Sequence, residues 1–267
     1  MLTVFNKFKT NVFNFSKYII YSIKCNISAA VNDRKSFIIQ TLFMFLNNFV
    51  WLGFWFILFY NSEGGNINGV TLMDIIYLWS IPTISYGICF FVFGGVEDLS
   101  YMIANKELDN ALTKPKHSLI SVVTSSAKSS AMGDILYGLV LGIFAVEFNP
   151  LKYVLLLLIS VIGALGFLGI CIIVNSFAFW FGDISKTAKM YTHNLLLTLT
   201  IYPKEMFNGI IKIMMYTLIP AMYVAHIPVA LIKDFSLSLL LFETVVVTLI
   251  LIISVKVYEK GLEKYGK

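Results

Sequence analysis

Two carboxylic acids interrupt long apolar stretches of this sequence, and they are its strongest candidates for chemistry. Asp134 lies about one turn into the stretch that begins at Ala131, and Glu243 lies about two turns into the stretch that begins at Leu237. A carboxylate at the centre of a bilayer costs roughly 2.5–3.5 kcal/mol, so such a residue usually faces a partner or a wet path. We expect Asp134 to cap a helix or to pair with a lysine such as Lys128. Glu243 either serves a pathway or a proton relay, or is a protonated or paired side chain shallow enough to reach water.

The remaining reactive groups are scattered. Asp134 and Asp183 both follow Gly and precede Ile, and paired aspartates can perform acid–base hydrolysis. However, the G-x-G-D pattern is absent, Asp183 fits a helix N-cap, and the G-x-S-G pattern of an intramembrane serine protease is missing. An intramembrane hydrolase is therefore a minor alternative. We expect no metal site, because no ligand spacing joins the histidines and cysteines: His117, His193, His226, Cys25, Cys89 and Cys171.

Membrane-spanning helices must position these residues. The chain is 58% hydrophobic and 13% charged, against about 45–50% and about 25% in soluble domains. Apolar runs of about 18 residues or more are typical of spanning helices. Six such runs occur, at residues 38–60, 72–96, 131–148, 151–181, 207–231 and 237–257. The expected fold class is an all-α integral membrane protein with six transmembrane helices, which fill a domain at residues 37–257.

The fifth run, residues 207–231, is interrupted by proline. Pro220 and Pro228 each break or kink a helix. We therefore expect one spanning helix followed by a short re-entrant or exofacial piece, which is tolerated only where protein or water satisfies the freed backbone.

Lysine and arginine are sorted between the gaps that separate these runs. Eighteen of the twenty lie in the N-terminal 36 residues, in 97–130, in 182–212 and in the tail from Lys256, and only Lys152 and Lys233 lie elsewhere. Short basic loops stay in the cytoplasm during insertion. Both termini, including the tail at 258–267, are therefore expected there. The net charge of +5 reports topology, whereas a nucleic-acid binder would cluster its basic residues on one face.

Two amphipathic segments are expected outside the spans. From Phe5 to Ile19, apolar residues recur at helical spacing, which predicts an interfacial helix within residues 1–36, or a cytoplasmic helix packed on protein. In the gap at 97–130 a second short helix is expected to end at Pro115. One side of this second helix is apolar, and it must pack on the chain's own spans or on a separate subunit. The other side is charged, with Glu97, Asp98, Lys106, Glu107 and Asp109.

Four segments resemble, in order, the six-span permease subunits of bacterial ATP-binding-cassette (ABC) exporters of the second type. Residues 106–115 (KELDNALTKP) resemble the family's G-E-L-D-x-x-L-x-R-P segment, and 133–138 (GDILYG) resemble its G-D-h-x-x-G opening of the third span. Tyr202-Pro203 and Phe207, with the prolines beyond, resemble its Y-P-x-x-x-F entry into the fifth span, and 261–265 (GLEKY) resemble its C-terminal G-L-R-R-Y. Lys106 replaces the family's glycine, and Lys114 replaces an arginine.

The resemblance implies a permease of the bacterial inner membrane. It would form the translocation path with a second copy or a paralogue, and it would rest on separate ATPase subunits that bind ATP and Mg. The chain lacks a G-x-x-x-x-G-K-[ST] phosphate loop, so we do not expect it to be an enzyme. Substitution of Leu108 by Asp is expected to uncouple ATP hydrolysis from export. The residues implied in ATPase coupling are Glu97, Leu99, Met102, Ile103, Glu107, Leu108, Asp109, Leu112, Lys114 and Pro115.

Apolarity and position suggest which residues line the path. Spans one, two and five are expected to reshape it, with Phe45, Asn48, Trp55 and Phe90 as lining side chains and Glu243 as a further candidate. The main alternative is a self-contained secondary transporter driven by an ion gradient. Such transporters carry broken helices in corresponding halves, and here only the fifth run is interrupted.

Overall fold

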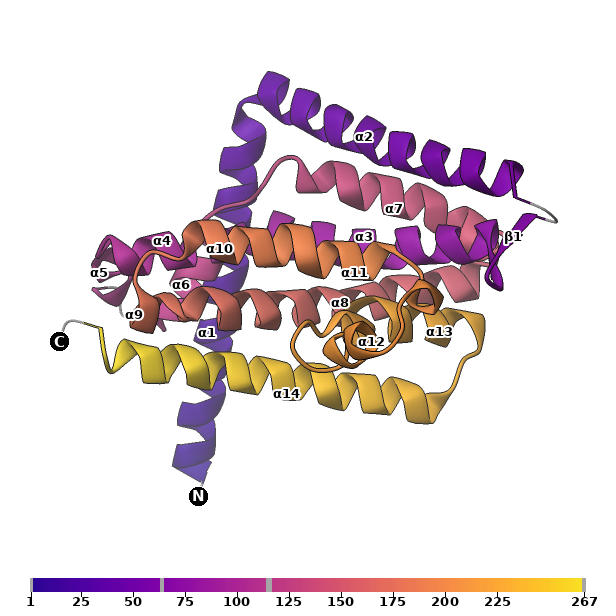
Figure 1. Ribbon diagram of the computed structural model, residues 1–267. Helices are drawn as coiled ribbons and strands as arrows, with labels where there is room; N and C mark the ends of the chain where they lie inside the picture. The colour runs from indigo at the N-terminus through magenta and orange to yellow at the C-terminus, as the bar shows by residue number, and fades with distance from the viewer. Residues whose placement is uncertain (1, 63–64, 114–116, 266–267) are drawn as a thin grey trace.

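The computed structural model describes residues 2–62, 65–113 and 117–265, with side chains from residue 17 onward. Nearly all of this chain is helical (Figure 1). The first half consists of α1 (Leu2–Asn32), α2 (Arg34–Tyr60), the antiparallel hairpin β1 (Asn66–Ile67) and β2 (Val70–Thr71), α3 (Leu72–Phe93), the 3₁₀ turn η2 (Gly94–Asp98), α4 (Leu99–Ala104), α5 (Asp109–Leu112), α6 (Ser118–Val123) and α7 (Ala131–Ala145). The second half consists of α8 (Pro150–Ser176), α9 (Ala178–Phe181), α10 (Ser185–Lys189), the π-helical η3 (Met190–Leu196), α11 (Leu197–Ile201), η4 (Lys204–Met206), α12 (Ile210–Met214), the π-helical η5 (Met222–His226), α13 (Ile227–Lys233) and α14 (Leu237–Leu262).

Four helical stretches of the described chain are long and apolar enough to cross a membrane, namely Arg34–Tyr60, Leu72–Ala104, Pro150–Phe181 and Leu237–Leu262. They coincide with four of the six expected runs, so the helical membrane class is confirmed. The third run corresponds to α7, a shorter helix of 15 residues. At 1.5 Å per residue α7 is about 22 Å long, less than the ~30 Å of a hydrocarbon core.

The expected fifth span is wrong. Residues 207–231 are broken into short helices, and the helix that runs along the bundle is instead formed by α10, η3 and α11 (Figure 1). This helix contains Lys186, Lys189 and His193, and these polar residues interrupt what would otherwise be an apolar run. Its sequence therefore did not predict a spanning helix. The Tyr202-Pro203 pair therefore marks the exit from this helix and not the entry into a span.

Residues 203–233 form a re-entrant segment that begins and ends at one end of the bundle. Lys204 and Lys233 line a common cavity of about 190 Å³ with Asp74, close to the β1–β2 hairpin. Between these two lysines the segment turns inward, where the hydroxyl of Tyr191 donates to the carbonyl oxygen of Leu218. Lys204 thus lies at the end that carries the hairpin, which corrects its expected grouping with the cytoplasmic lysines. We call this end the hairpin end and the opposite one the α5 end.

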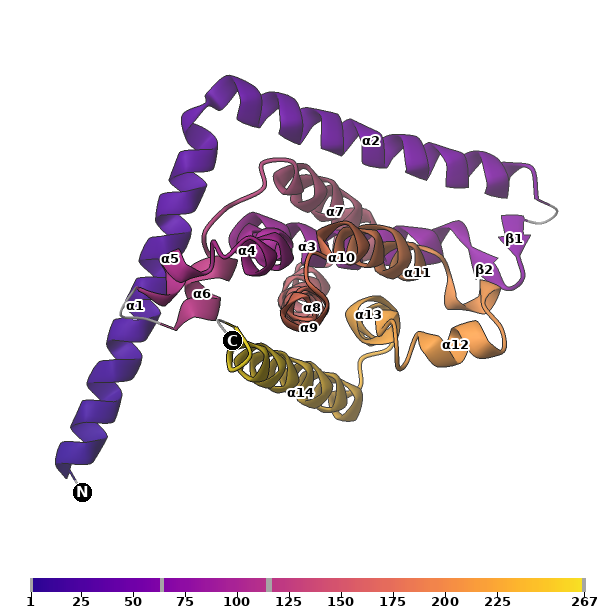
Figure 2. The same cartoon turned by 60° about the vertical axis from the view of Figure 1, so that its left-hand side comes forward.

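Helix α1 crosses the α5 end at a steep angle to α2 (Figure 2). The bend follows from Asp33, whose carboxylate accepts a hydrogen bond from the Ser36 amide (3.2 Å) and so starts α2. Tyr18 of α1 bonds to Ser121 within α6, and Ser22 bonds to Thr124 just beyond its end, at 2.8 Å each. The apolar stripe expected from Phe5 to residue 16 falls outside the described side chains.

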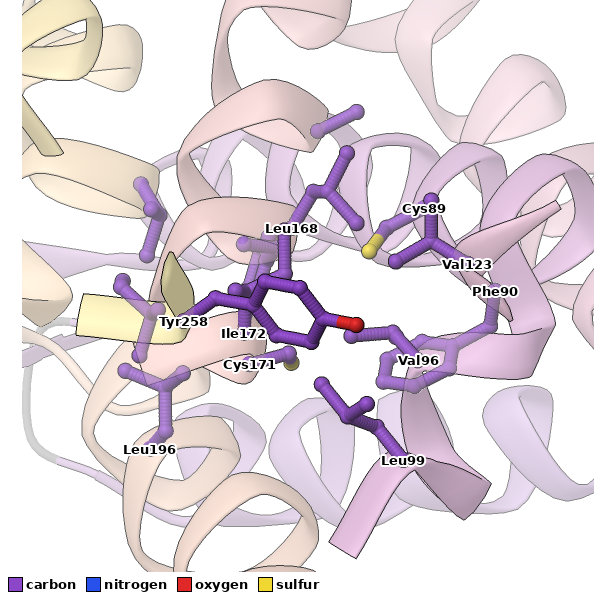
Figure 3. Close-up of a cluster of buried hydrophobic side chains, with 14 of the residues drawn as sticks. Cys89, Phe90, Val96, Leu99, Val123, Leu168, Cys171, Ile172, Leu196 and Tyr258 are labelled. Carbon is purple, nitrogen blue, oxygen red and sulfur yellow. The ribbon is translucent and has the colours of Figure 1, made fainter. Parts of the chain in front are cut away.

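The largest core cluster lies toward the α5 end and joins α3, α8 and α14 (Figure 3). Cys89, Leu99, Cys171 and Tyr258 are all buried in it. The Tyr258 hydroxyl also forms a 2.9 Å hydrogen bond with Ser118 of α6. This core therefore ties the short helices of the α5 end to the long helices of the bundle.

Candidate coupling segment and translocation path

The segment between α3 and α6 is a chain of short helices around one tight turn. After α4 ends at Ala104, the amides of Glu107 and Leu108 both donate to the carbonyl oxygen of Met102, at 2.9 and 3.2 Å. Lys106 adopts a φ of +60° to close this turn. Left-handed backbone of this kind usually carries glycine at a helix C-terminus, which is the residue that the resembled motif has at this position. The turn therefore forms even though lysine replaces glycine.

The apolar side of this segment is buried within the chain itself. Leu99, Ile103, Leu108 and Ala111 are all buried in the large core cluster, and Met102 packs at its edge. Of the two partners that the sequence left open for this side, the structure selects the chain's own helices.

What remains exposed is a patch of mixed charge. We call it the exposed turn: Asn105, Lys106, Glu107, Asp109, Asn110 and Leu112. Lys114 and Pro115, also implied in coupling, lie outside the described residues.

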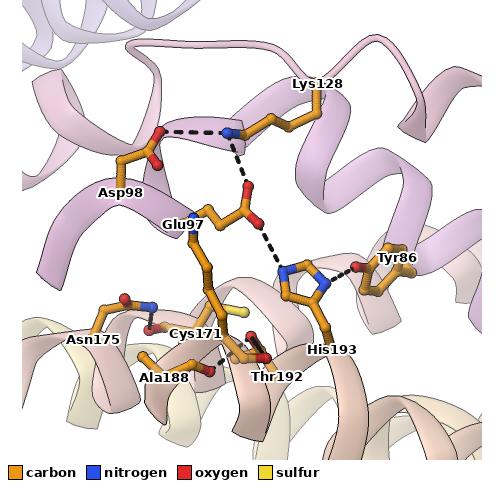
Figure 4. A network of polar contacts seen from close by, with 10 residues as sticks. Tyr86, Glu97, Asp98, Lys128, Cys171, Asn175, Ala188, Thr192 and His193 are labelled. Atoms are coloured by element: carbon orange, nitrogen blue, oxygen red, sulfur yellow. Dashed lines mark hydrogen bonds and ion pairs between the residues drawn. The ribbon is translucent and has the colours of Figure 1, made fainter. Parts of the chain in front are cut away.

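Glu97 does not belong to the exposed charged side, contrary to the expectation from the sequence. Its side chain is only 17% exposed, and its carboxylate bonds to Lys128 Nζ at 2.9 Å and to His193 Nε2 at 2.8 Å (Figure 4). His193 Nδ1 in turn bonds to the hydroxyl of Tyr86, and Lys128 also lies 3.4 Å from Asp98. A neutral imidazole satisfies both contacts, because Nε2–H donates to Glu97 while Nδ1 accepts from Tyr86.

We call these four residues, Glu97, Lys128, His193 and Tyr86, the polar network. In it the positive charge of Lys128 is matched by the negative charge of Glu97. Burial alone would lower the pKa of Lys128, but the hydrogen bond that Lys128 donates to Glu97 and the charges of Glu97 and Asp98 outweigh it and raise the pKa. Lys128 is therefore held as a cation between two carboxylates. The network joins η2, the loop before α7, and η3, which are far apart in the sequence.

Asp134 pairs with an amide and not with Lys128, which corrects the expected partner. The side-chain nitrogen of Asn48 donates to Asp134 Oδ1 at 2.8 Å, and both residues are buried. Together they line a cavity of about 120 Å³ between α2, α3, α7 and α11. Trp79 and Thr200 also line this cavity. These two residues carried no signal in the sequence, because an apolar run does not show which of its faces meets another helix.

The other expected path residues are not all near this cavity. The ring of Phe45 packs edge-on against Tyr137 with centroids 6.4 Å apart, and Trp55 is buried against Tyr202 with centroids 5.5 Å apart. Both belong to α2, as Asn48 does, but neither lines the cavity. Phe90 lies in the core cluster, 5.3 Å from the ring of His193.

Glu243 is fully buried on α14, and its carboxyl oxygens have no hydrogen-bond partner among the described residues. The structure therefore gathers Phe45, Asn48 and Trp55 on α2 and leaves Phe90 and Glu243 elsewhere. Within the described ranges, no three histidine, cysteine, aspartate or glutamate side chains are grouped as a metal ion would require.

Residues 44–267 of the chain match the model of a family described as ABC-2 family transporter protein. This range includes the exposed turn, the polar network and the cavity beside Asp134, and it begins after α1. No curated protein matches the chain.

Proposed function

Because this chain belongs to the ABC-2 transporter family, it is a membrane permease subunit of an ABC transporter, and we propose that it serves an ATP-driven exporter of the bacterial plasma membrane. ATP and Mg²⁺ would bind to separate ATPase subunits. A second permease, either a copy or a paralogue, would complete the translocation path. The observation that supports this function best is the exposed turn, which is charged outside and firmly packed inside.

The proposed topology has six crossings, by α2, α3, α7, α8, the helix at 185–201 and α14. An even number of crossings puts both termini at the α5 end. Most lysines still gather there, including Lys106, Lys186 and Lys256, whereas Lys152, Lys204 and Lys233 belong to the hairpin end. Since basic loops remain inside, we place the α5 end in the cytoplasm. Helix α1, which crosses this end, would then lie along the inner membrane surface.

The exposed turn is proposed to bind the ATPase. A docking element must present side chains to its partner while its own base moves as a rigid body with the spans. Leu108 and Ala111 are buried beneath the turn, whereas Glu107 and Asp109 point to solvent. The implied coupling residues thus divide into a contacting set on the surface and an anchoring set in the core.

The polar network provides a mechanical link from this turn to the path. Glu97 lies two residues before the start of α4, and it bonds to His193 in the helix at 185–201. Movement of the turn by closing ATPases would therefore be transmitted to this helix and, through Tyr86, to α3. Both helices line the cavity beside Asp134. Alternating access is proposed to arise as these helices move relative to α2.

The second permease is proposed to cover α2. This helix is apolar and largely exposed along its length, as at Phe43, Val50 and Ile57. Because the cavity lies between α2 and α11, a second subunit on this side would enlarge it into a path.

A charge reversal on the exposed turn tests this function. Leu108 is a poor position for it, because an aspartate there would bury a charge in the core and disturb folding itself. We expect Glu107→Lys combined with Asp109→Lys to leave the protein in the membrane but to reduce co-purification of the ATPase and substrate export together. Glu147→Lys, an exposed acid near the hairpin end, is the matched control. Undiminished ATPase binding by the double variant would refute the proposed coupling element.

A further inference from the structure

A large apolar groove lies on the side of the bundle away from α2. It has a volume of about 810 Å³ and runs between α14, the helix at 185–201 and the re-entrant segment, with α8 beneath it. This volume falls in the size range of small-molecule sites. None of the described residues that line it is charged, and its oxygen-bearing side chains are threonines and tyrosines.

In the proposed topology the groove opens sideways, within the depth of the membrane. Leu249 and Ile253 of α14 line it, and both belong to a helix that is long and apolar enough to span. Tyr223 and Leu218 of the re-entrant segment close it toward the hairpin end, where Tyr191 holds Leu218 by a hydrogen bond. α14 is mostly exposed in this subunit. With the second permease placed on α2, the proposed arrangement leaves this groove facing hydrocarbon.

Lysines continue the groove at its α5 end. Lys256 and Lys260 follow Ile253 by three and seven residues on α14, so helical periodicity places them on the same face. Lys186 and Lys189 lie on α10, on the other side of the groove, and all four lysines are exposed.

Three acids lie at the same end of these elements: Asp183 just before α10, Glu259 on α14, and the exposed Glu263, which follows Lys260 by three residues. Asp183 accepts hydrogen bonds from the Ser185 amide and hydroxyl, at 3.0 and 2.5 Å, and Glu259 lies 3.4 Å from His117. These acids keep their charge, but the four exposed lysines outnumber the three acids, so the mouth of the groove carries a net positive formal charge.

We propose that this groove binds one acyl chain of an anionic phospholipid of the inner leaflet, with the headgroup held by Lys256 and Lys260. The apolar walls match a hydrocarbon chain, and the re-entrant segment limits how deep the chain reaches. Each lysine near an anionic headgroup contributes enough binding energy for a preference of about fivefold. The bound lipid would rest against Leu218 and Tyr223, and so it would support the re-entrant segment from the cytoplasmic side.

Photolabelling with two lipids tests the proposal. The full-length protein is placed in phosphatidylcholine bilayers with a small fraction of a phosphatidylglycerol probe, or of a phosphatidylcholine probe, each with a diazirine in its acyl chain. After illumination, labelled peptides are mapped by mass spectrometry. We expect the anionic probe to label segments 216–223 and 246–253 at least about fivefold more than the neutral probe.

Matched variants separate a bound lipid from the general lipid coat. Leu249→Trp fills the groove and should abolish labelling there, whereas Ile252→Trp should not, because Ile252 is similarly exposed (46% against 51%) but does not line the groove. Lys256→Ala with Lys260→Ala should reduce the anionic preference to that of the neutral probe, and Lys152→Ala should leave it unchanged.

Three results would overturn the proposal. The first is equal labelling by both probes, and the second is equal loss of label in the two tryptophan variants, since either would indicate only the lipid coat. The third is a disulfide between two copies through Leu249→Cys, which would show that protein covers the groove. These readouts require no transport, so they stand apart from the tests of the exporter function.

Discussion

Glu97 should contribute more to stability than any surface ion pair at the α5 end. The variant Glu97→Gln keeps the shape of the side chain but removes the charge that faces Lys128 and His193. Breaking a fully buried pair costs about 3–5 kcal/mol, whereas an exposed pair is worth about 1 kcal/mol or less. Because Lys128 is 32% exposed and retains Asp98 at 3.4 Å, we expect an intermediate cost of about 2 kcal/mol.

Thermal unfolding in detergent measures this cost. For a chain of this size, 2 kcal/mol corresponds to a fall in Tm of about 4–8 °C. The control is Glu259→Gln, whose partner His117 lies 3.4 Å away at the same end but whose side chain is 55% exposed. That variant should lose at most about 2–4 °C. A double-mutant cycle of Glu97→Gln with Lys128→Met should give a coupling energy of about 1 kcal/mol or more. Equal Tm values for the two glutamine variants, or a coupling energy near zero, would refute the role of the network.

Three further substitutions test the local geometry by the same unfolding measurement. Lys106→Gly should stabilise the protein by about 0.5–1 kcal/mol, because glycine adopts the left-handed backbone without strain; a loss of stability would contradict the turn. Gly133→Ala should cost about 1–3 kcal/mol, because its Cβ would lie 2.4 Å from a backbone oxygen of α2, whereas Gly53→Ala has open space and should cost far less. Asn48→Leu should cost about 1–3 kcal/mol by leaving a buried carboxyl unpaired, and adding Asp134→Leu should recover most of it; no recovery would argue against their contact.

Local composition predicted much of the helical framework. The runs at 38–60 and 237–257 end or begin where α2 and α14 do, because apolar length is a direct requirement of the bilayer. The helix at 185–201 was missed for the same reason, since its lysines and His193 make it too polar for a hydropathy search. Residues 207–231 gave the opposite error, because their apolar sequence predicted a spanning helix where the structure has several short ones. Part of this segment is buried against the bundle, as at Met222 and Val224, and part is exposed, as at Ile210 and Leu218. Hydropathy does not record whether an apolar segment crosses the membrane.

The candidate site was predictable only as far as local patterns reach. The amphipathic pattern correctly placed Leu99 and Leu108 in the core, but Leu112, which was expected on the same apolar side, is 41% exposed. Glu97 was misassigned because its partners lie 31 and 96 residues away, and no spacing rule connects them. Asn48 and Asp134 were both singled out, but their contact across 86 residues depends on how α2 packs on α7. Contacts of this kind depend on the tertiary fold, and no periodic pattern in the sequence indicates them.

The most direct test of the account places a photoreactive amino acid at Asp109, on the exposed turn, in living cells. Illumination should join the permease to a second polypeptide that carries a phosphate-binding loop, and the same probe at Lys152, near the hairpin end, should not. A cross-link to such an ATPase from Lys152 but not from Asp109 would contradict both the proposed orientation and the coupling role of the turn.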